Sequence, residues 1–285
     1  QPHLIRHGAG YTVFEHRSHG IDQQMRLFTT AGDPVKLICL RLENMSGRMR
    51  RITATYYADW VLGPDREGMQ PFIVTSYDNA DHALYVHNTY NTEFGERVAF
   101  LSADRPLHGF TASRSEFLGR MGDYRRPAAL GRIGLANDTT AGTDPCGAIQ
   151  VHVNLPPGEV REVCFLLGQG KNREDAQRLV AKYREPGRIN AAWDETVEFW
   201  EALLDSVAVE TPDAAMDLML NRWLVYQNLS CRIWGRSALY QSSGAFGFRD
   251  QLQDMMGILH HEPEIAREHI LLAARHQFAE GDVLH

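Results

Sequence analysis

The chain reads IQVHVNLPPGEVREVCFL over residues 149–166. Apolar and polar side chains alternate as far as Leu155, the segment Pro156–Gly158 supplies turn residues, and a second apolar-rich run starts at Val160. A period of two is typical of strands that bury one face, because successive side chains of a strand point to opposite sides. The stretch therefore predicts a β-hairpin within a region of strands.

The same alternation extends toward the N-terminus. Ile52, Ala54 and Tyr56 alternate with polar residues, and short runs of this kind are separated by Gly, Asn and Asp as far as about Gly168. Many short strands without an intervening helical period are typical of an antiparallel sandwich. We therefore predict an antiparallel β-sandwich domain over residues 1–170.

The pattern changes to a helical period after Gly168. Asn172 is a suitable N-cap for a helix from Arg173, and the Pro186–Gly187 pair ends that helix before a second one over residues 190–204. These two helices predict a helical linker over residues 171–210. Residues 211–285 then predict further helices. The first of them carries a stripe at helical spacing that we expect to be core; it comprises Met216, Met219, Leu220, Trp223 and Gln227.

Composition excludes several classes of protein. The 285 residues are 44% hydrophobic and 23% charged, which is typical of a soluble globular chain. The net charge of −7 has the wrong sign for a surface that neutralises nucleic acid. No run approaches the roughly 18 apolar residues of a spanning helix, and the first residues lack the apolar core of a signal peptide.

The four cysteines lie far apart in the sequence, with no pair at the spacing of a structural zinc site. The prediction from residue type is buried, reduced thiols in a cytoplasmic protein, and two disulfides remain the alternative. Both ends of the chain suggest a longer parent protein, because it starts without Met and stops at His285 within an ordinary stretch of composition.

The 13 histidines do not predict a metal site. The motif H-E-x-x-H is absent, and His260 and His261 are adjacent, so on a helix their side chains would diverge. The nucleophile motif G-x-S-x-G is also absent. We therefore expect neither a metal ion nor a serine nucleophile.

Polar residues are dense at the start of one predicted helix. Arg249, Asp250, Gln251, Gln253 and Asp254 fall within two turns, and the two aspartates, four residues apart, share a face. Such a set is typical of a solvated helix start, where acidic side chains complement the helix dipole. It is also what a sugar-binding cleft requires beside aromatic rings. Spacing alone leaves both interpretations open.

Several motifs resemble the family that contains cellobiose and chitobiose phosphorylases, and within it most closely the phosphorylase region of cyclic β-1,2-glucan synthases. The catalytic-barrel motifs are Arg236–Ala238, Gly247–Asp254 and Gln277–His285. The sandwich motifs are His7–Tyr11, Phe14–His16, Ser18–Ile21 and Trp60–Gly63. The resemblance covers essentially the whole chain and implies a supersandwich-like β-sandwich, a helical linker and the first helices of a truncated (α/α)6 barrel over residues 211–285.

The resemblance also implies a reaction and its residues. In this family phosphate attacks the anomeric carbon with inversion and releases α-glucose 1-phosphate, while one acid protonates the leaving oxygen. The resemblance implies substrate binding by Asp250, Arg249 and Gln241, and phosphate binding by Arg236, with no cofactor apart from phosphate as co-substrate. The glycine-rich turn before Phe248 lacks an Arg that cellobiose phosphorylases carry there. The family's general acid lies downstream of the Gln277–Phe278 motif, so we expect no catalytic acid in this chain and no activity of the chain alone.

Three functions follow as alternatives. The first is the phosphorylase region of a cyclic β-1,2-glucan synthase, whose parent carries a membrane-embedded glycosyltransferase at the cytoplasmic face of the bacterial inner membrane. The second is a free-standing 1,2-β-oligoglucan phosphorylase. The third is a non-catalytic carbohydrate-binding or structural module. Homo-oligomer formation stays open, and nucleic acid is not an expected partner.

Overall fold

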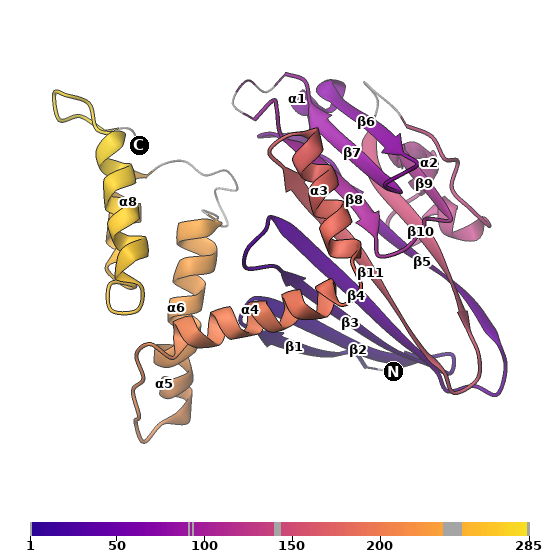
Figure 1. Ribbon diagram of the computed structural model, residues 1–285, viewed down its shortest axis with the longest axis horizontal. Coiled ribbons are helices and arrows are strands. Elements are labelled where there is room, and N and C mark those ends of the chain that lie inside the picture. Colours follow the sequence, from indigo (N-terminus) through magenta and orange to yellow (C-terminus); the bar gives the residue numbers. More distant parts are fainter. Residues whose placement is uncertain (1, 91, 93, 140–143, 236–246, 284–285) are drawn as a thin grey trace. The chain divides into compact units, whose positions relative to one another are not determined.

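The computed structural model describes residues 2–90, 92, 94–139, 144–235 and 247–283 (Figure 1). It divides into two compact units, Gln1–Thr196 and Val197–His285. Strands occupy the first unit and helices the second, with two long helices at the end of the strand region. The predicted order of an antiparallel sandwich followed by helices is confirmed. The three-part division at residues 170 and 210 stays a prediction.

The first unit contains two antiparallel sheets. The larger sheet has the order β1-β2-β3-β4-β11-β8-β7-β6, and the smaller sheet has the order β5-β10-β9. The strands of the larger sheet are β1 Leu4–Gly8, β2 Tyr11–Ser18, β3 Ile21–Thr29, β4 Val35–Asn44, β6 Ile73–Asp78, β7 Ala83–Asn88, β8 Val98–Ala103 and β11 Val160–Gly170. Those of the smaller sheet are β5 Arg50–Asp59, β9 Gly109–Ser113 and β10 Pro145–Leu155. Short helical turns interrupt the strands at α1 Arg66–Met69, η1 Gln70–Phe72, α2 Arg114–Leu118 and η2 Ala128–Gly131.

The larger sheet is buried on both faces over its centre. Val163 and Phe165 of β11 belong to the apolar cluster shared with the smaller sheet, which includes Ile149 and Val151 of β10. The intervening Cys164 and Leu166 belong to a second cluster on the opposite face. Because both faces are covered, the strand has a continuous apolar run in place of strict alternation.

The predicted hairpin over residues 149–166 is wrong in its pairing. Strand β10 pairs with β5 and β9, whereas β11 pairs with β4 and β8, so the turn carries the chain from one sheet to the other. The apolar side chains of the two strands meet face to face across the core, which buries more surface than edge pairing of the same strands would. Asn44 at the end of β4 holds the turn, because its side-chain amide donates to the Leu155 carbonyl at 2.8 Å and its carbonyl accepts from Gly158 N at 2.8 Å.

Two helices follow the last strand. Helix α3, Arg173–Arg184, starts at the predicted N-cap, where the Asn172 side chain accepts from the Asp175 N–H at 2.9 Å. Its buried residues Leu179, Val180 and Tyr183 join the second apolar cluster of the larger sheet, and Figure 1 shows the helix lying over that sheet. Helix α4, Arg188–Leu204, begins directly after the Pro–Gly pair.

Beyond the end of α4, the described part of the second unit contains one interrupted helix and two further helices. The interrupted helix runs through α5 Ala214–Leu218, the π-helical stretch η3 Met219–Trp223, α6 Leu224–Gln227 and the π-helical stretch η4 Asn228–Trp234. Helices α7 Phe248–Met255 and α8 Pro263–Arg275 follow. The prediction that the stripe on the first of these helices is core is wrong for Met216, Met219 and Trp223, whose exposed fractions are 41% or more.

No helix among the described residues has the length and apolar character needed to cross a bilayer.

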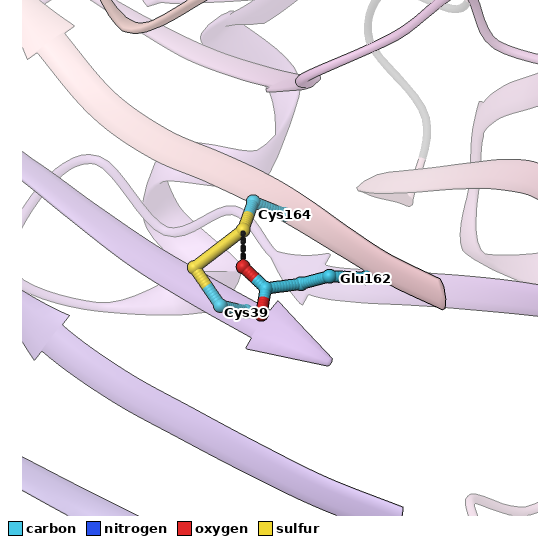
Figure 2. A group of neighbouring side chains, drawn as sticks. All are labelled: Cys39, Glu162 and Cys164. Atoms are coloured by element: carbon cyan, nitrogen blue, oxygen red, sulfur yellow. Dashed lines mark hydrogen bonds between the residues drawn. A yellow bond between two sulfur atoms is a disulfide. The ribbon is translucent and has the colours of Figure 1, made fainter. Parts of the chain in front are cut away.

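The prediction that the cysteines are reduced thiols requires a correction. Cys39 and Cys164 lie opposite one another on β4 and β11 and form a disulfide (Figure 2). Cys146 is a buried free thiol and Cys231 a half-buried one. Adjacent strands bring residues 125 positions apart into register, which sequence spacing does not reveal.

A charge network anchors the long connection between β9 and β10. The Asp144 carboxylate accepts hydrogen bonds from Arg66 at 2.6 Å and Arg114 at 2.9 Å. Tyr124, within the connection, donates to Asp59 on β5. Burial alone raises the pKa of Asp144, but the hydrogen bonds from both guanidinium groups outweigh it and hold that pKa below its usual value.

Asp144→Asn is expected to destabilise the chain by roughly 1–2 kcal/mol at neutral pH, because two guanidinium groups lose a charged acceptor. A carboxylate with a depressed pKa stabilises the fold above its unfolded-state pKa and loses this effect as the pH falls through the folded value. The difference between variant and wild type should therefore shrink below about pH 4. Urea unfolding at several pH values measures it, with the exposed Asp194→Asn as control. A difference independent of pH would contradict the assignment.

Candidate functional site

The polar segment predicted at a helix start forms the first turns of α7. The helix begins at Phe248 behind Gly247, whose carbonyl accepts the Gln251 N–H at 3.0 Å. No described side chain caps this terminus, and Asp250 is the acidic residue of the first turn. The N-terminal N–H groups and the helix dipole favour negative charge at this position.

Asp250 and Arg249 are both accessible. The Arg249 Nη1 atom lies 3.1 Å from the Asp250 Oδ1 atom, and their side chains are 83% and 51% exposed. An ion pair this exposed contributes little to stability, because water screens both charges. The Asp250 carboxylate is therefore accessible to solvent despite its contact with Arg249.

Asp254 lies one turn further along the same face and has a structural role. Its Oδ2 atom accepts from the Arg232 Nε atom at 2.9 Å, and its carbonyl accepts from the Asn228 side chain at 2.7 Å. Both partners belong to η4, so these contacts join α7 to the preceding helix. The sequence reasoning did not identify Arg232 or Asn228, because they lie more than 20 residues upstream with no motif of their own.

Of the remaining polar residues predicted near the site, the structure describes Gln251 but not Arg236 or Gln241. Gln251 is buried, with 7% of its surface exposed, so its side chain belongs to the interior of the unit. Arg236 and Gln241 lie outside the described residues. A common cleft formed by Asp250, Arg249, Arg236 and Gln241 therefore stays a prediction.

His260 and His261 lie in the turn between α7 and α8, not on a helix. His261 contacts the Ser206 hydroxyl through Nδ1 at 3.0 Å, and burial together with the charge of neighbouring His260 lowers its pKa. Among the described residues of the second unit, no three His, Cys, Asp or Glu side chains lie close enough together to hold a metal ion.

Aromatic side chains gather in the same unit. Trp200 is packed against Tyr226 and Trp234, with ring centroids 4.7 and 5.5 Å apart. Trp223 and Trp234 remain 43% and 48% exposed. Exposed indole rings of this kind suit the apolar C–H face of a sugar ring.

Comparison with protein families assigns both units. Residues 1–186 match the model of the glycosyl hydrolase 94 supersandwich domain. Residues 199–285 match the model of the glycosyl hydrolase 94 superfamily catalytic domain. The helical unit that carries Asp250 thus coincides with the catalytic-domain match.

Three curated relatives are informative. The cyclic beta-(1,2)-glucan synthase NdvB of Rhizobium meliloti (strain 1021) is 39% identical over 98% of this chain and 10% of its own length. The N,N'-diacetylchitobiose phosphorylase of Vibrio furnissii is 28% identical over 99% of this chain and 36% of its own. The solabiose phosphorylase of Paenibacillus borealis is 30% identical over 96% of this chain and 35% of its own length. The chain thus spans little more than a third of these proteins at most.

Two matched substitutions separate the roles of the aspartates. Asp254→Asn is expected to destabilise the chain by about 1 kcal/mol, because it weakens the contact with Arg232. Asp250→Asn should change stability by no more than about 0.5 kcal/mol, because its partner is exposed. Chemical denaturation of both variants measures the difference. Equal destabilisation by the two substitutions would show that Asp250 has a structural role as well.

Proposed function

Because the chain belongs to the glycosyl hydrolase 94 superfamily, we propose that it forms part of a glycoside phosphorylase that cleaves β-1,2-glucan with inorganic phosphate. The two domain matches and the phosphorylase relatives support a glycoside phosphorylase-like region. The observation that carries the choice of substrate is the 39% identity, over 98% of the chain, with a protein named as a cyclic beta-(1,2)-glucan synthase.

The proposed reaction is an inverting phosphorolysis. A phosphate oxygen forms a bond to the anomeric carbon from the face opposite the glycosidic oxygen, the glycosidic C–O bond breaks, and the leaving oxygen takes a proton from a carboxylic acid. The products are α-glucose 1-phosphate and a glucan shorter by one residue. Phosphate is the co-substrate and no further cofactor takes part.

Asp250 is proposed to bind the sugar in the donor subsite. Its support is local: the carboxylate is exposed, lies in the first turn of α7 and pairs with the exposed Arg249. A charged acceptor can bind two neighbouring hydroxyl groups more strongly than a neutral one. Arg249 and Gln241 are proposed to complete the sugar contacts, and Arg236 to bind phosphate.

We propose that the parent protein is a synthase of cyclic β-1,2-glucan, with its phosphorylase region at the cytoplasmic face of the inner membrane beside a membrane-embedded glycosyltransferase. The chain's alignment with only 10% of the length of its synthase relative is compatible with such a parent. There, phosphorolysis would trim the growing glucan. The second candidate is a free-standing 1,2-β-oligoglucan phosphorylase, favoured by the match to phosphorylases of which the chain spans about a third.

In a parent protein that contains this chain and shows activity, Asp250→Asn is expected to lower kcat/KM for β-1,2-glucan by roughly 10- to 150-fold. This range corresponds to the loss of about 1.5–3 kcal/mol for a charged hydrogen bond. Release of glucose 1-phosphate is the measurement, and the exposed Glu264→Gln on α8 is the control. Unchanged kinetics of Asp250→Asn would remove this residue from the donor subsite.

The 285-residue chain alone is expected not to release glucose 1-phosphate from β-1,2-glucan and phosphate. The proposed general acid lies outside it, and a positioned acid contributes on the order of 10²–10⁴-fold to such reactions. The assay compares the chain with a phosphorylase-length protein. Binding of β-1,2-glucan by that longer protein without any turnover would favour the non-catalytic carbohydrate-binding module. Phosphate-dependent release by the chain alone would place the acid within residues 1–285.

A further inference from the structure

A cluster of three potential metal ligands lies on the larger sheet of the sandwich unit. Cys39 and Cys164 are directly opposite on neighbouring strands, and Glu162 precedes Cys164 by two residues, so its side chain projects from the same face. The Glu162 Oε1 atom lies 3.5 Å from the Cys164 Sγ atom (Figure 2). The two sulfur atoms and a carboxylate oxygen all lie within 4.8 Å of one another.

The surroundings of the cluster are asymmetric. Both cysteines are 2% exposed and pack within the apolar cluster under α3, whereas Glu162 is exposed. The sulfur atoms are thus held on paired strands, and the carboxylate lies on the solvent side of the cluster. Rigid ligands that are already close together lose little conformational freedom on binding an ion.

We propose that reduction of the Cys39–Cys164 disulfide creates a site for one soft divalent metal ion, of which Zn²⁺ is the best fit. A dithiol supplies two electrons and two protons and is itself oxidised to a disulfide, while the protein S–S bond breaks to give two thiols. The ion then binds both sulfur atoms and releases both thiol protons. Glu162 is the third ligand and water the fourth.

The ligand set favours zinc on chemical grounds. Zn²⁺ accepts thiolate and carboxylate ligands together in tetrahedral geometry, whereas Mg²⁺ and Ca²⁺ prefer oxygen alone. The disulfide excludes the ion, because its sulfur atoms carry no negative charge. The redox state of the cysteines therefore decides whether the site exists.

Neighbouring cations compensate the charge of the ligands. Two thiolates and a carboxylate carry more negative charge than a divalent ion neutralises. Arg26 stands opposite Cys39 in the β3–β4 register, and Arg41 stands opposite Glu162 in the β4–β11 register. Arg41 also hydrogen-bonds to Glu43 at 2.9 Å, so the Arg26 guanidinium, which lies over the Trp193 ring, is the one that offsets the remaining charge.

Cobalt titration tests the proposal. The chain is reduced with a dithiol, freed of the reductant without oxygen and titrated with Co²⁺, whose thiolate complexes have a charge-transfer absorption band. We expect one equivalent of Co²⁺ to bind the reduced chain, Zn²⁺ to displace it, and the oxidised chain to show no band. Glu162→Gln should weaken binding by about tenfold or more, whereas Glu159→Gln, outside the cluster, and the thiol variant Cys231→Ser should bind as the wild type does.

Circular dichroism shows whether each reduced chain is folded, so that loss of metal binding can be distinguished from unfolding. The proposal is overturned if the reduced chain is folded but shows no band, if Glu162→Gln binds as tightly as wild type, or if reduction unfolds the chain. It is also overturned if a folded Cys39→Ser/Cys164→Ser variant keeps the band, because the ion would then bind elsewhere. Protection of both thiols from alkylation by Zn²⁺ in the reduced wild type supports it independently.

Discussion

Burial of β11 on both faces is the constraint on which the first unit depends. This strand pairs with β4 along one edge and β8 along the other, while its side chains enter two apolar clusters in alternation. One cluster requires the smaller sheet and the other requires α3, so removing either layer would expose large apolar side chains to water. The two sheets and helix α3 therefore depend on one another for stability. The Cys39–Cys164 disulfide joins β4 to β11 at the centre of the larger sheet.

The sequence predicted the local elements of this arrangement well and their pairing less well. A period of two identified the strands, and Asn172 identified the start of α3, because these signals depend on residues close together in the chain. The separation of β10 and β11 into different sheets depends on which apolar faces meet across the core. Alternation is identical for strands that pair by their edges and strands that pack by their faces, so the pattern could not distinguish the two.

The candidate site shows the same division between local and tertiary information. The spacing of Asp250 and Asp254 placed both on one face of α7, as observed. Their different environments arise from η4, which supplies Arg232 and Asn228 to Asp254 and nothing described to Asp250. Asp254 joins two helices and Asp250 remains accessible because of how η4 packs against α7. The spacing of residues within α7 does not contain that information.

Exposure of the Met216, Met219 and Trp223 stripe can be understood from the same principle. A helical period shows that one face is apolar, but it does not say which element covers that face. Two π-helical stretches interrupt the helix that carries the stripe, and such stretches shift the side chains that follow them around the axis. The second of these stretches supplies Arg232 and Asn228, the partners of Asp254, to α7. An irregular stretch with poorer helical hydrogen-bond geometry thus carries the side chains that make the polar contacts with Asp254, whereas the Asp250 carboxylate is exposed beside Arg249.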